Sequence, residues 1–240
     1  MVLWETGWRQ GTVLCLLNLP FEKETENRPL SPLSPPDKRT KTMTLPEIRI
    51  LIDQVDPEIR RLLMKRMDYS AMVAEAKLAA GDTAVYRPDR EEAVLERLGR
   101  EVPEDRLPEY LSVVRKIMEA SRMYQYDLIY DRLEDPLGPL LKGINIPEDC
   151  RLVTVMLSRP DRPGSIAAVL SMIGDCGFDT EKLERTGGDP RSGMVTFRLQ
   201  IRGDLNEARM KKLFFQLSGE CEDFRILGCA GCSPEEKTAE

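Results

Sequence analysis

A helical pattern from Leu45 to about Ala80 constrains this chain more than any other feature, because apolar residues recur there every three or four positions. The pattern begins with Thr44 as an N-cap and Pro46 in the first turn, where a proline is favourable. Glu47, three residues after Thr44, completes a capping box. Pro57 lies inside the pattern, where a proline costs about 3 kcal/mol, so we expect a bend or a restart there. A helix of roughly 35 residues is about 50 Å long, more than one small domain covers, and this length implies a partner chain.

Two further helical patterns follow, from Pro88 to about Arg100 and from Pro108 to about Tyr130, and no strand pattern precedes residue 150. Residues 131–149 hold three prolines and two glycines, a composition typical of a linker. We therefore expect a helical domain over residues 44–130 and a linker over 131–149.

After residue 150 the period of the apolar residues changes from helical spacing to alternation. The strand patterns are RLVTVML, FDTEKLERT, SGMVTFRLQIR and CEDFRILGC, the helical patterns are PGSIAAVLSMIGDCG and NEARMKKLFFQLS, and GGDPR forms a turn between the middle strands. The resulting order, βαββαβ, predicts a ferredoxin-like sandwich over residues 150–229 with two helices on one face of the sheet. The expected fold class is a two-domain chain, an α domain followed by an α/β domain.

Composition excludes several kinds of chemistry. The chain has no histidine, which rules out Ser/His and Cys/His nucleophile pairs, His-ligated zinc and the commonest general acid or base. A formal charge of −6 argues against a nucleic-acid partner, and no apolar run is long enough to span a membrane. We expect no metal and no cofactor.

The two ends lack periodicity, and we expect disordered tails over residues 1–43 and 230–240. Met43 is the expected biological start, and TVLCLLNLP is a poor signal peptide because little positive charge precedes it. Six dispersed cysteines indicate a reduced, cytoplasmic protein. The CAGC motif at 229–232 lacks the second cysteine pair of a zinc site, and the role of Cys229 and Cys232 stays open.

Polar side chains lie in or beside the apolar stripes of all three helices. They are Arg66 and Lys77 on the first helix, Arg90 and Glu91 on the second, and Ser121 and Gln125 on the third. Buried charges cost several kcal/mol unless they are paired, and two interpretations are open. One is a self-satisfied network in which Arg66 and Lys77 pair with Glu91. The other is an anion pocket, because the inward cations outnumber the inward carboxylate.

Four stretches of the helical region are recognisable: LPEIRILIDQVDPEIRRLLMKRM, VAEAK, RPDREEAVLERL and IMEASRMYQ. Through them, residues 45–130 resemble the all-helical chorismate mutase family. The resemblance implies two intertwined three-helix chains, a homodimer with two sites, that convert the substrate chorismate to prephenate without a cofactor. Such a pericyclic rearrangement needs no nucleophile, so a chain without histidine lacks nothing that the reaction requires.

The same resemblance implies roles for individual residues. Lys77 and Gln125 would contact the ether oxygen of the breaking bond, and Glu91 would contact the ring hydroxyl. The substrate carboxylates would be held by Arg66, Arg90 and a partner chain's Arg49, with Ser121 assisting.

Arg87 departs from the family pattern, which usually has an aspartate at this position, just before Pro88. The aspartate caps the helix and helps to place the substrate hydroxyl. An arginine forfeits a good N-cap and opposes the helix dipole, unless Asp89 or Thr83 compensates. Arg87 is therefore a candidate substrate-binding residue whose effect on activity, a loss or a retuning, is open.

Residues 150–229 resemble an ACT domain, a βαββαβ module that binds small ligands, often amino acids, between copies. The stretches SRPDRPGSIAAVL and LERTGG carry this resemblance. It implies control by an aromatic amino acid such as phenylalanine or tyrosine, whose carboxylate would meet turn amides and a helix N-terminus. The candidate effector-binding residues are Asp161, Arg162, Pro163, Gly164 and Ser165. A dimerisation module without a ligand is the alternative.

The order of the two modules resembles a chorismate mutase/prephenate dehydratase that lacks the dehydratase segment. The favoured hypothesis is a cytoplasmic, homodimeric chorismate mutase with an amino-acid effector. A non-catalytic protein that senses chorismate or an amino acid is the alternative, and a purely structural scaffold is a third. The identity and the sign of the effector, and any assembly beyond a dimer, are not predicted.

Overall fold

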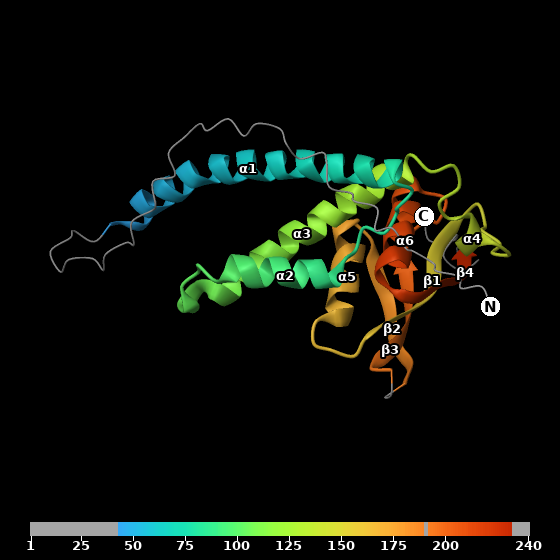
Figure 1. Ribbon diagram of the computed structural model, residues 1–240. Coiled ribbons are helices and arrows are strands. Elements are labelled where there is room, and N and C mark those ends of the chain that lie inside the picture. Colours follow the sequence, from blue (N-terminus) through green and yellow to red (C-terminus); the bar gives the residue numbers. More distant parts are fainter. Residues whose placement is uncertain (1–42, 190–191, 232–240) are drawn as a thin grey trace, which may run out of the picture. The chain divides into compact units, whose positions relative to one another are not determined.

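The computed structural model describes residues 43–189 and 192–231 of the chain (Figure 1). The tails are expected over residues 1–43 and 230–240. Residues 1–42 and 232–240, and with them Cys232, lie outside the described residues, whereas Ala230 and Gly231 belong to the last strand and not to a tail. The N-terminal part contains α1 (Leu45–Ala79), α2 (Pro88–Gly99), the short 3-10 helix η1 (Glu104–Arg106) and α3 (Leu107–Tyr130). The three helices expected from apolar periodicity are confirmed.

The capping box at the start of α1 is present. The Thr44 amide and hydroxyl both donate to the Glu47 carboxylate, at 2.7 and 2.8 Å. The backbone hydrogen bond stabilises the charged form and lowers the pKa of Glu47. Helix α1 runs without interruption through Pro57, so a restart there is wrong.

Helix α1 leaves most of its apolar side chains exposed. Its buried residues are Ser70 and Ala74, whereas Leu51, Ile52, Val55, Ile59 and Leu62 are exposed. Exposed apolar side chains on this scale are typical of interaction surfaces in soluble proteins. Although α1 is long, neither it nor any other helix in residues 43–189 and 192–231 is apolar enough over a sufficient length to cross a membrane.

The C-terminal part has the predicted βαββαβ order. Its elements are β1 (Cys150–Pro160), α5 (Ser165–Asp175), β2 (Asp179–Asp189), β3 (Met194–Arg202), α6 (Ala208–Glu220) and β4 (Glu222–Gly231). The strands form an antiparallel sheet in the order β2-β3-β1-β4, with Val155 of β1 paired to Leu199 on one side and Ile226 on the other. Strand β2 continues through Gly187 and Gly188, so the turn starts later than expected, and residues 190–191 lie outside the described part.

Helices α5 and α6 cover one face of this sheet (Figure 1). The core between them is formed by Leu157, Leu199 and Ile201 from the sheet, Val169 and Ile173 from α5, and Leu213, Phe214 and Leu217 from α6. These residues alternate along the strands and recur at helical spacing on the helices, as burial of one face requires.

The segment over residues 131–149 is not the open linker that its prolines and glycines predict. It contains the short helix α4 (Gly138–Leu141), and Leu137 is 2% exposed in the core of the C-terminal part. Ile144 and Ile146 pack against the same core. Apolar burial therefore fixes this segment to the sheet.

Helix α3 packs against α6. Tyr126 and Tyr130 meet Phe215 edge to face, with ring centroids 5.9 and 5.7 Å apart. Gly219 allows this close approach, because a Cβ atom there would lie 2.6 Å from the Tyr126 hydroxyl. The same junction brings together polar side chains of both helices, Arg122 of α3 and Glu220 of α6.

Candidate active site

A cavity of about 480 Å³ lies among the three N-terminal helices. Its lining includes Arg66, Lys77, Asp82, Arg87, Arg90, Glu91, Ser121, Arg122 and Gln125, together with apolar residues such as Val73, Val85 and Met118. All the substrate-site residues expected from the sequence line this cavity except Arg49, whose side chain is exposed on α1. The expected contact of Arg49 with a partner's pocket stays a prediction.

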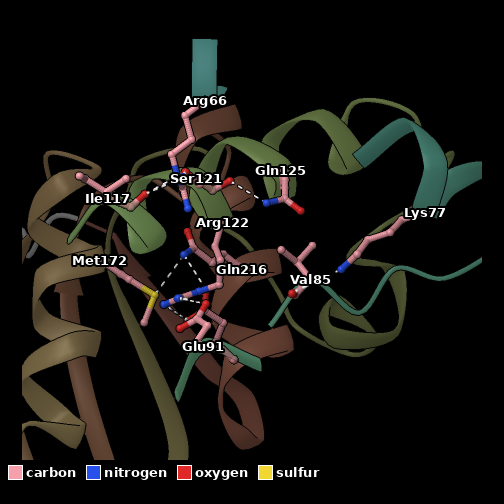
Figure 2. Close-up of polar contacts among 11 residues, drawn as sticks. Arg66, Lys77, Val85, Glu91, Ile117, Ser121, Arg122, Gln125, Met172 and Gln216 are labelled. Carbon is pink, nitrogen blue, oxygen red and sulfur yellow. Dashed lines mark hydrogen bonds and ion pairs between the residues drawn. The ribbon is translucent and has the colours of Figure 1, made fainter. Parts of the chain in front are cut away.

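Arg66 is held against α3 (Figure 2). Its guanidinium donates to the Ser121 hydroxyl and, at 3.3 Å, to the Ile117 carbonyl. Partial burial lowers the pKa of Arg66, and the nearby charge of Glu91 opposes that shift. Its hydrogen-bond partners are neutral oxygens, so the guanidinium at the cavity wall is not hydrogen-bonded to a carboxylate.

Lys77 lies in the last turn of α1 and donates to the backbone carbonyls of Ala84 and Val85, at 2.5 and 3.4 Å (Figure 2). Partial burial lowers the pKa of this lysine, and Asp82 opposes the shift while Arg87 and Arg90 add to it. The ammonium is thus fixed by the loop between α1 and α2 and has neutral partners.

Ser121 and Gln125 occupy successive turns of α3. The Ser121 hydroxyl donates to the Ile117 carbonyl at 2.8 Å, and the Gln125 amide donates to the Ser121 carbonyl at 3.2 Å. These contacts fix both side chains on the cavity side of the helix. Of the two polar residues expected in the apolar seam of α3, Ser121 is buried together with Val114 and Met118, and Gln125 is half-buried.

The self-satisfied network required Glu91 to pair with Arg66 and Lys77, and neither pair is formed. Its carboxylate accepts a hydrogen bond from Arg122 at 2.5 Å, and Arg122 also binds Glu220 of α6 at 3.0 and 3.1 Å. Arg122 and Glu220 are buried, with side chains 9% and 1% exposed. Burial opposes ionisation of Arg122, but the two carboxylates prevail and raise its pKa.

The network continues into the C-terminal part. Gln216 donates to Glu220 at 2.9 Å and to the Met172 sulfur at 3.2 Å (Figure 2). Arg159 of β1 donates to the backbone carbonyl of Glu220. A chain of hydrogen bonds therefore joins the cavity to the helices that cover the sheet.

Sequence patterns alone did not identify Arg122, because it lies one position beside the seam of α3. Its burial depends on α6, which packs there from nearly a hundred positions away along the chain. A signal was available in α6, where Glu220 follows Leu213, Gln216 and Leu217 on the inner stripe. A carboxylate in an apolar stripe requires a buried cation as its partner.

Arg87 is the N-cap of α2 and makes no side-chain capping hydrogen bond. It binds Asp82 at 2.8 Å instead, and Asp89 in the first turn of α2 supplies a negative charge near the helix N-terminus. The Ala84 amide, assisted by the charge of Arg87, lowers the pKa of Asp82. Arg90 is exposed at the cavity rim.

The cavity carries an excess of positive charge. Arg87 is balanced by Asp82, and Arg122 by Glu91 and Glu220. Three further cations line the cavity, Arg66, Lys77 and Arg90. Within residues 43–189 and 192–231, none of the three forms an ion pair with a carboxylate. An arrangement of this kind suits a small dianion.

The expected effector residues lie at the turn before α5. Gly164 is its N-cap, with a φ of 80°, and the Asp161 carboxylate accepts from Arg185 at 3.3 Å on the exposed side. Arg162, Pro163, Gly164 and Ser165 face a second cavity.

Cys229 of the CAGC motif is a free thiol, and burial raises its pKa to about 12.

The fold and the cavity define an all-helical domain whose interior cavity is lined by more cationic than anionic side chains. Residues 48–126 match the family model described as Chorismate mutase type II. The match identifies this stretch as a chorismate mutase domain, and chorismate mutases are isomerases. The C-terminal part is an α+β domain with a four-stranded antiparallel sheet.

A search of curated proteins finds no match to the chain. Among solved structures, a similar one is described as "GqqA- a novel type of quorum quenching acylases", at 18% identity and a TM-score of 0.35. The similar region covers 39% of this chain and 48% of that one, so the chain spans about half of its length. A likeness at this TM-score supports neither a shared fold nor a shared function.

Proposed function

We propose that the chain is a chorismate mutase whose helical cavity isomerises chorismate to prephenate. One observation carries the proposal: within a chorismate mutase type II domain, a single cavity gathers Arg66, Lys77, Glu91 and Gln125 with more cations than carboxylates. Chorismate carries two carboxylates, an ether oxygen and a ring hydroxyl, and this lining offers a partner for each.

In the proposed complex, Arg66 and Arg90 hold the substrate carboxylates, with Ser121 orienting Arg66. A pericyclic rearrangement requires the flexible side chain of the substrate to fold over the ring, and fixed cations on rigid helices achieve this at low entropic cost. Lys77 and Gln125 donate to the ether oxygen, where negative charge grows as the bond breaks. Glu91 keeps one oxygen on Arg122 and offers the other to the ring hydroxyl.

The proposed assembly is a cytoplasmic homodimer in which α1 of each chain covers the other. The exposed apolar face of α1 supports this, because a monomer in water gains nothing from leaving Leu51, Val55 and Ile59 uncovered. A second copy would also bring Arg49 to the cavity. Light scattering coupled to gel filtration tests the assembly; a monomer at micromolar concentration would contradict it.

For the C-terminal domain we propose an ACT-type regulatory role, with an aromatic amino acid as effector. The βαββαβ order and the turn at Arg162 to Ser165 support this role. The assay is chorismate turnover with and without phenylalanine, tyrosine and tryptophan. Identical rates in all four conditions would contradict regulation by aromatic amino acids.

The proposed activity is tested by following chorismate loss and prephenate formation with the purified chain. Lys77→Ala removes a donor to the ether oxygen and should reduce kcat by about 10²- to 10³-fold, as loss of one such donor typically does. Lys142→Ala is the control, since Lys142 is exposed after α4. Equal rates for the parent and Lys77→Ala would refute the assignment.

A non-catalytic chorismate sensor is the second candidate, and Arg87 favours it. This arginine leaves the N-terminus of α2 without a side-chain cap and is tied to Asp82. Calorimetry that shows tight chorismate binding by a chain that forms no prephenate would select this candidate.

A further inference from the structure

The guanidinium group of Arg122 on α3 is held along one edge, at one end and on one face. Its Nε and Nη2 atoms donate to the two carboxylate oxygens of Glu220, at 3.0 and 3.1 Å, and its Nη1 atom donates to Glu91 at 2.5 Å. The ring of Tyr86 lies against the group, with its centroid 4.9 Å from the guanidinium carbon. Paired hydrogen bonds along one edge fix the plane of a guanidinium. Glu220 therefore determines the direction in which Nη1 points toward Glu91.

Glu220 is itself fixed from two directions. Gln216 donates to its carboxylate at 2.9 Å, and Arg159 of β1 donates to its backbone carbonyl. The Glu220 side chain is 1% exposed, so water offers it no alternative partner. It is the last residue of α6, where the helix dipole opposes a negative charge. A carboxylate in this place depends on the positive charge of Arg122.

Stability alone is a weak reason for such an arrangement. The attraction within a buried ion pair is largely offset by the cost of taking both charges out of water, and apolar side chains of similar volume often stabilise a fold equally well. A buried network of charges does fix one geometry, because each charge must meet its partner. In this network Glu91 and Glu220 share a single cation, so Glu91 has no cation of its own to neutralise it.

Glu91 and Arg122 line the mutase cavity, whereas Glu220 and Gln216 do not. One carboxylate oxygen of Glu91 is bound by Arg122, and the other is left to accept from a ligand hydroxyl. The stretch that matches the mutase family ends at residue 126, so Glu220 lies outside it. The direction of a carboxylate in the cavity thus depends on a side chain of the C-terminal domain.

We propose that Glu220 is a positioning residue of the mutase site, which acts through Arg122 to hold Glu91 in the orientation that accepts the ring hydroxyl of chorismate. The helical domain is then not a self-sufficient enzyme, because α6 of the C-terminal domain supplies the anchor. This role rests on the proposed function, since Glu91 needs positioning only for that substrate. An acceptor fixed in advance needs no reorganisation when the substrate reacts.

The test is steady-state turnover of chorismate by the full chain, by Glu220→Gln and by the matched control Glu222→Gln. Glu222 has the same side chain two residues further on and is exposed. Glu220→Gln keeps the size of the side chain and leaves Arg122 paired with Glu91, and circular dichroism at the assay temperature checks that the variant is folded. Loss of the paired anchor should reduce kcat/KM by about tenfold or more. The control should match the parent.

A second substitution, Glu91→Gln, separates positioning from a general effect on the fold. Because Glu220 acts through Glu91, the loss caused by Glu220→Gln should disappear once Glu91 has been replaced. The double variant should match Glu91→Gln within about twofold. An equal fractional loss in both backgrounds overturns the inference, as does a Glu91→Gln variant as fast as the parent.

Gln216→Leu is the milder variant should Glu220→Gln fail to fold. It removes one hydrogen bond to the Glu220 carboxylate and leaves both contacts with Arg122 in place. Its loss of kcat/KM should be smaller and should also disappear in the Glu91→Gln background. A loss that persists there contradicts the role of Glu220.

The same measurements separate failure of this role from failure of the proposed function. A parent chain that leaves chorismate unchanged contradicts the mutase assignment and the role of Glu220 together. A parent that forms prephenate no faster than a folded Glu220→Gln variant contradicts the role of Glu220 alone.

Discussion

Arg122→Met removes the cation at the centre of the buried network and should strongly destabilise the chain. The substitution keeps a long side chain against Tyr86, whose ring centroid lies 4.9 Å from the guanidinium carbon. It leaves Glu220, with a side chain 1% exposed, as an uncompensated carboxylate, and it frees Glu91, which is 25% exposed.

Removing one partner of a buried ion pair costs about 3–5 kcal/mol, because the other charge stays buried without compensation. For a folded region of this size, 1 kcal/mol corresponds to roughly 2–4 °C in melting temperature, which gives a decrease of about 6–20 °C. Replacing both members, as in Arg122→Met with Glu220→Leu, removes the orphaned charge and should restore most of the loss.

Urea denaturation followed by circular dichroism measures these free energies of unfolding. The matched control is Arg132→Met, which breaks the exposed Arg132–Glu75 pair at 2.9 Å and should cost less than about 1 kcal/mol. An Arg122→Met variant as stable as the control, or a double variant whose loss equals the sum of the single losses, would refute the reasoning.

Four further outcomes are expected. Arg66→Leu should abolish turnover while the melting temperature is kept or raised, whereas an idle structural arginine would leave turnover unchanged. Gly219→Ala should cost about 1–3 kcal/mol in urea denaturation, because its Cβ would lie 2.6 Å from the Tyr126 hydroxyl. Arg87→Ser should gain about 0.5–2 kcal/mol from a new N-cap, and an unchanged stability would contradict the capping argument. Burial lowers the pKa of Lys77, so the protonated donor is lost as pH rises through that lowered value. The value of kcat/KM should therefore fall at a pH below the ordinary lysine range, and in Lys77→Arg the fall should move to a higher pH.

Local periodicity was sufficient to predict the helices and the βαββαβ order, because burial of one face imposes a period of 3.6 on helices and 2 on strands. It also placed Ser121 in the buried seam of α3, since a polar residue in an apolar stripe is visible from spacing alone. Pro57 misled the prediction, because continuous turns on both sides of a proline can outweigh the bond that it removes.

The other failures share one cause, which is contact between segments far apart in the chain. Leu137 belongs to a stretch whose prolines predict a linker, yet the sheet core buries it. Glu91 pairs with Arg122 because α6 brings Glu220 to the same point, and no local pattern on α2 contains that information. The second cavity is closed by α2 for the same reason: the turn at Ser165 was visible, but the helix facing it was not.

The most direct test of the central claim is the rate at which the purified chain converts chorismate to prephenate, compared with Lys77→Ala. The account predicts turnover well above the uncatalysed rate for the parent and a loss of about 10²- to 10³-fold in the variant. A parent that leaves chorismate unchanged, or a variant as fast as the parent, would contradict the assignment of catalysis to this cavity.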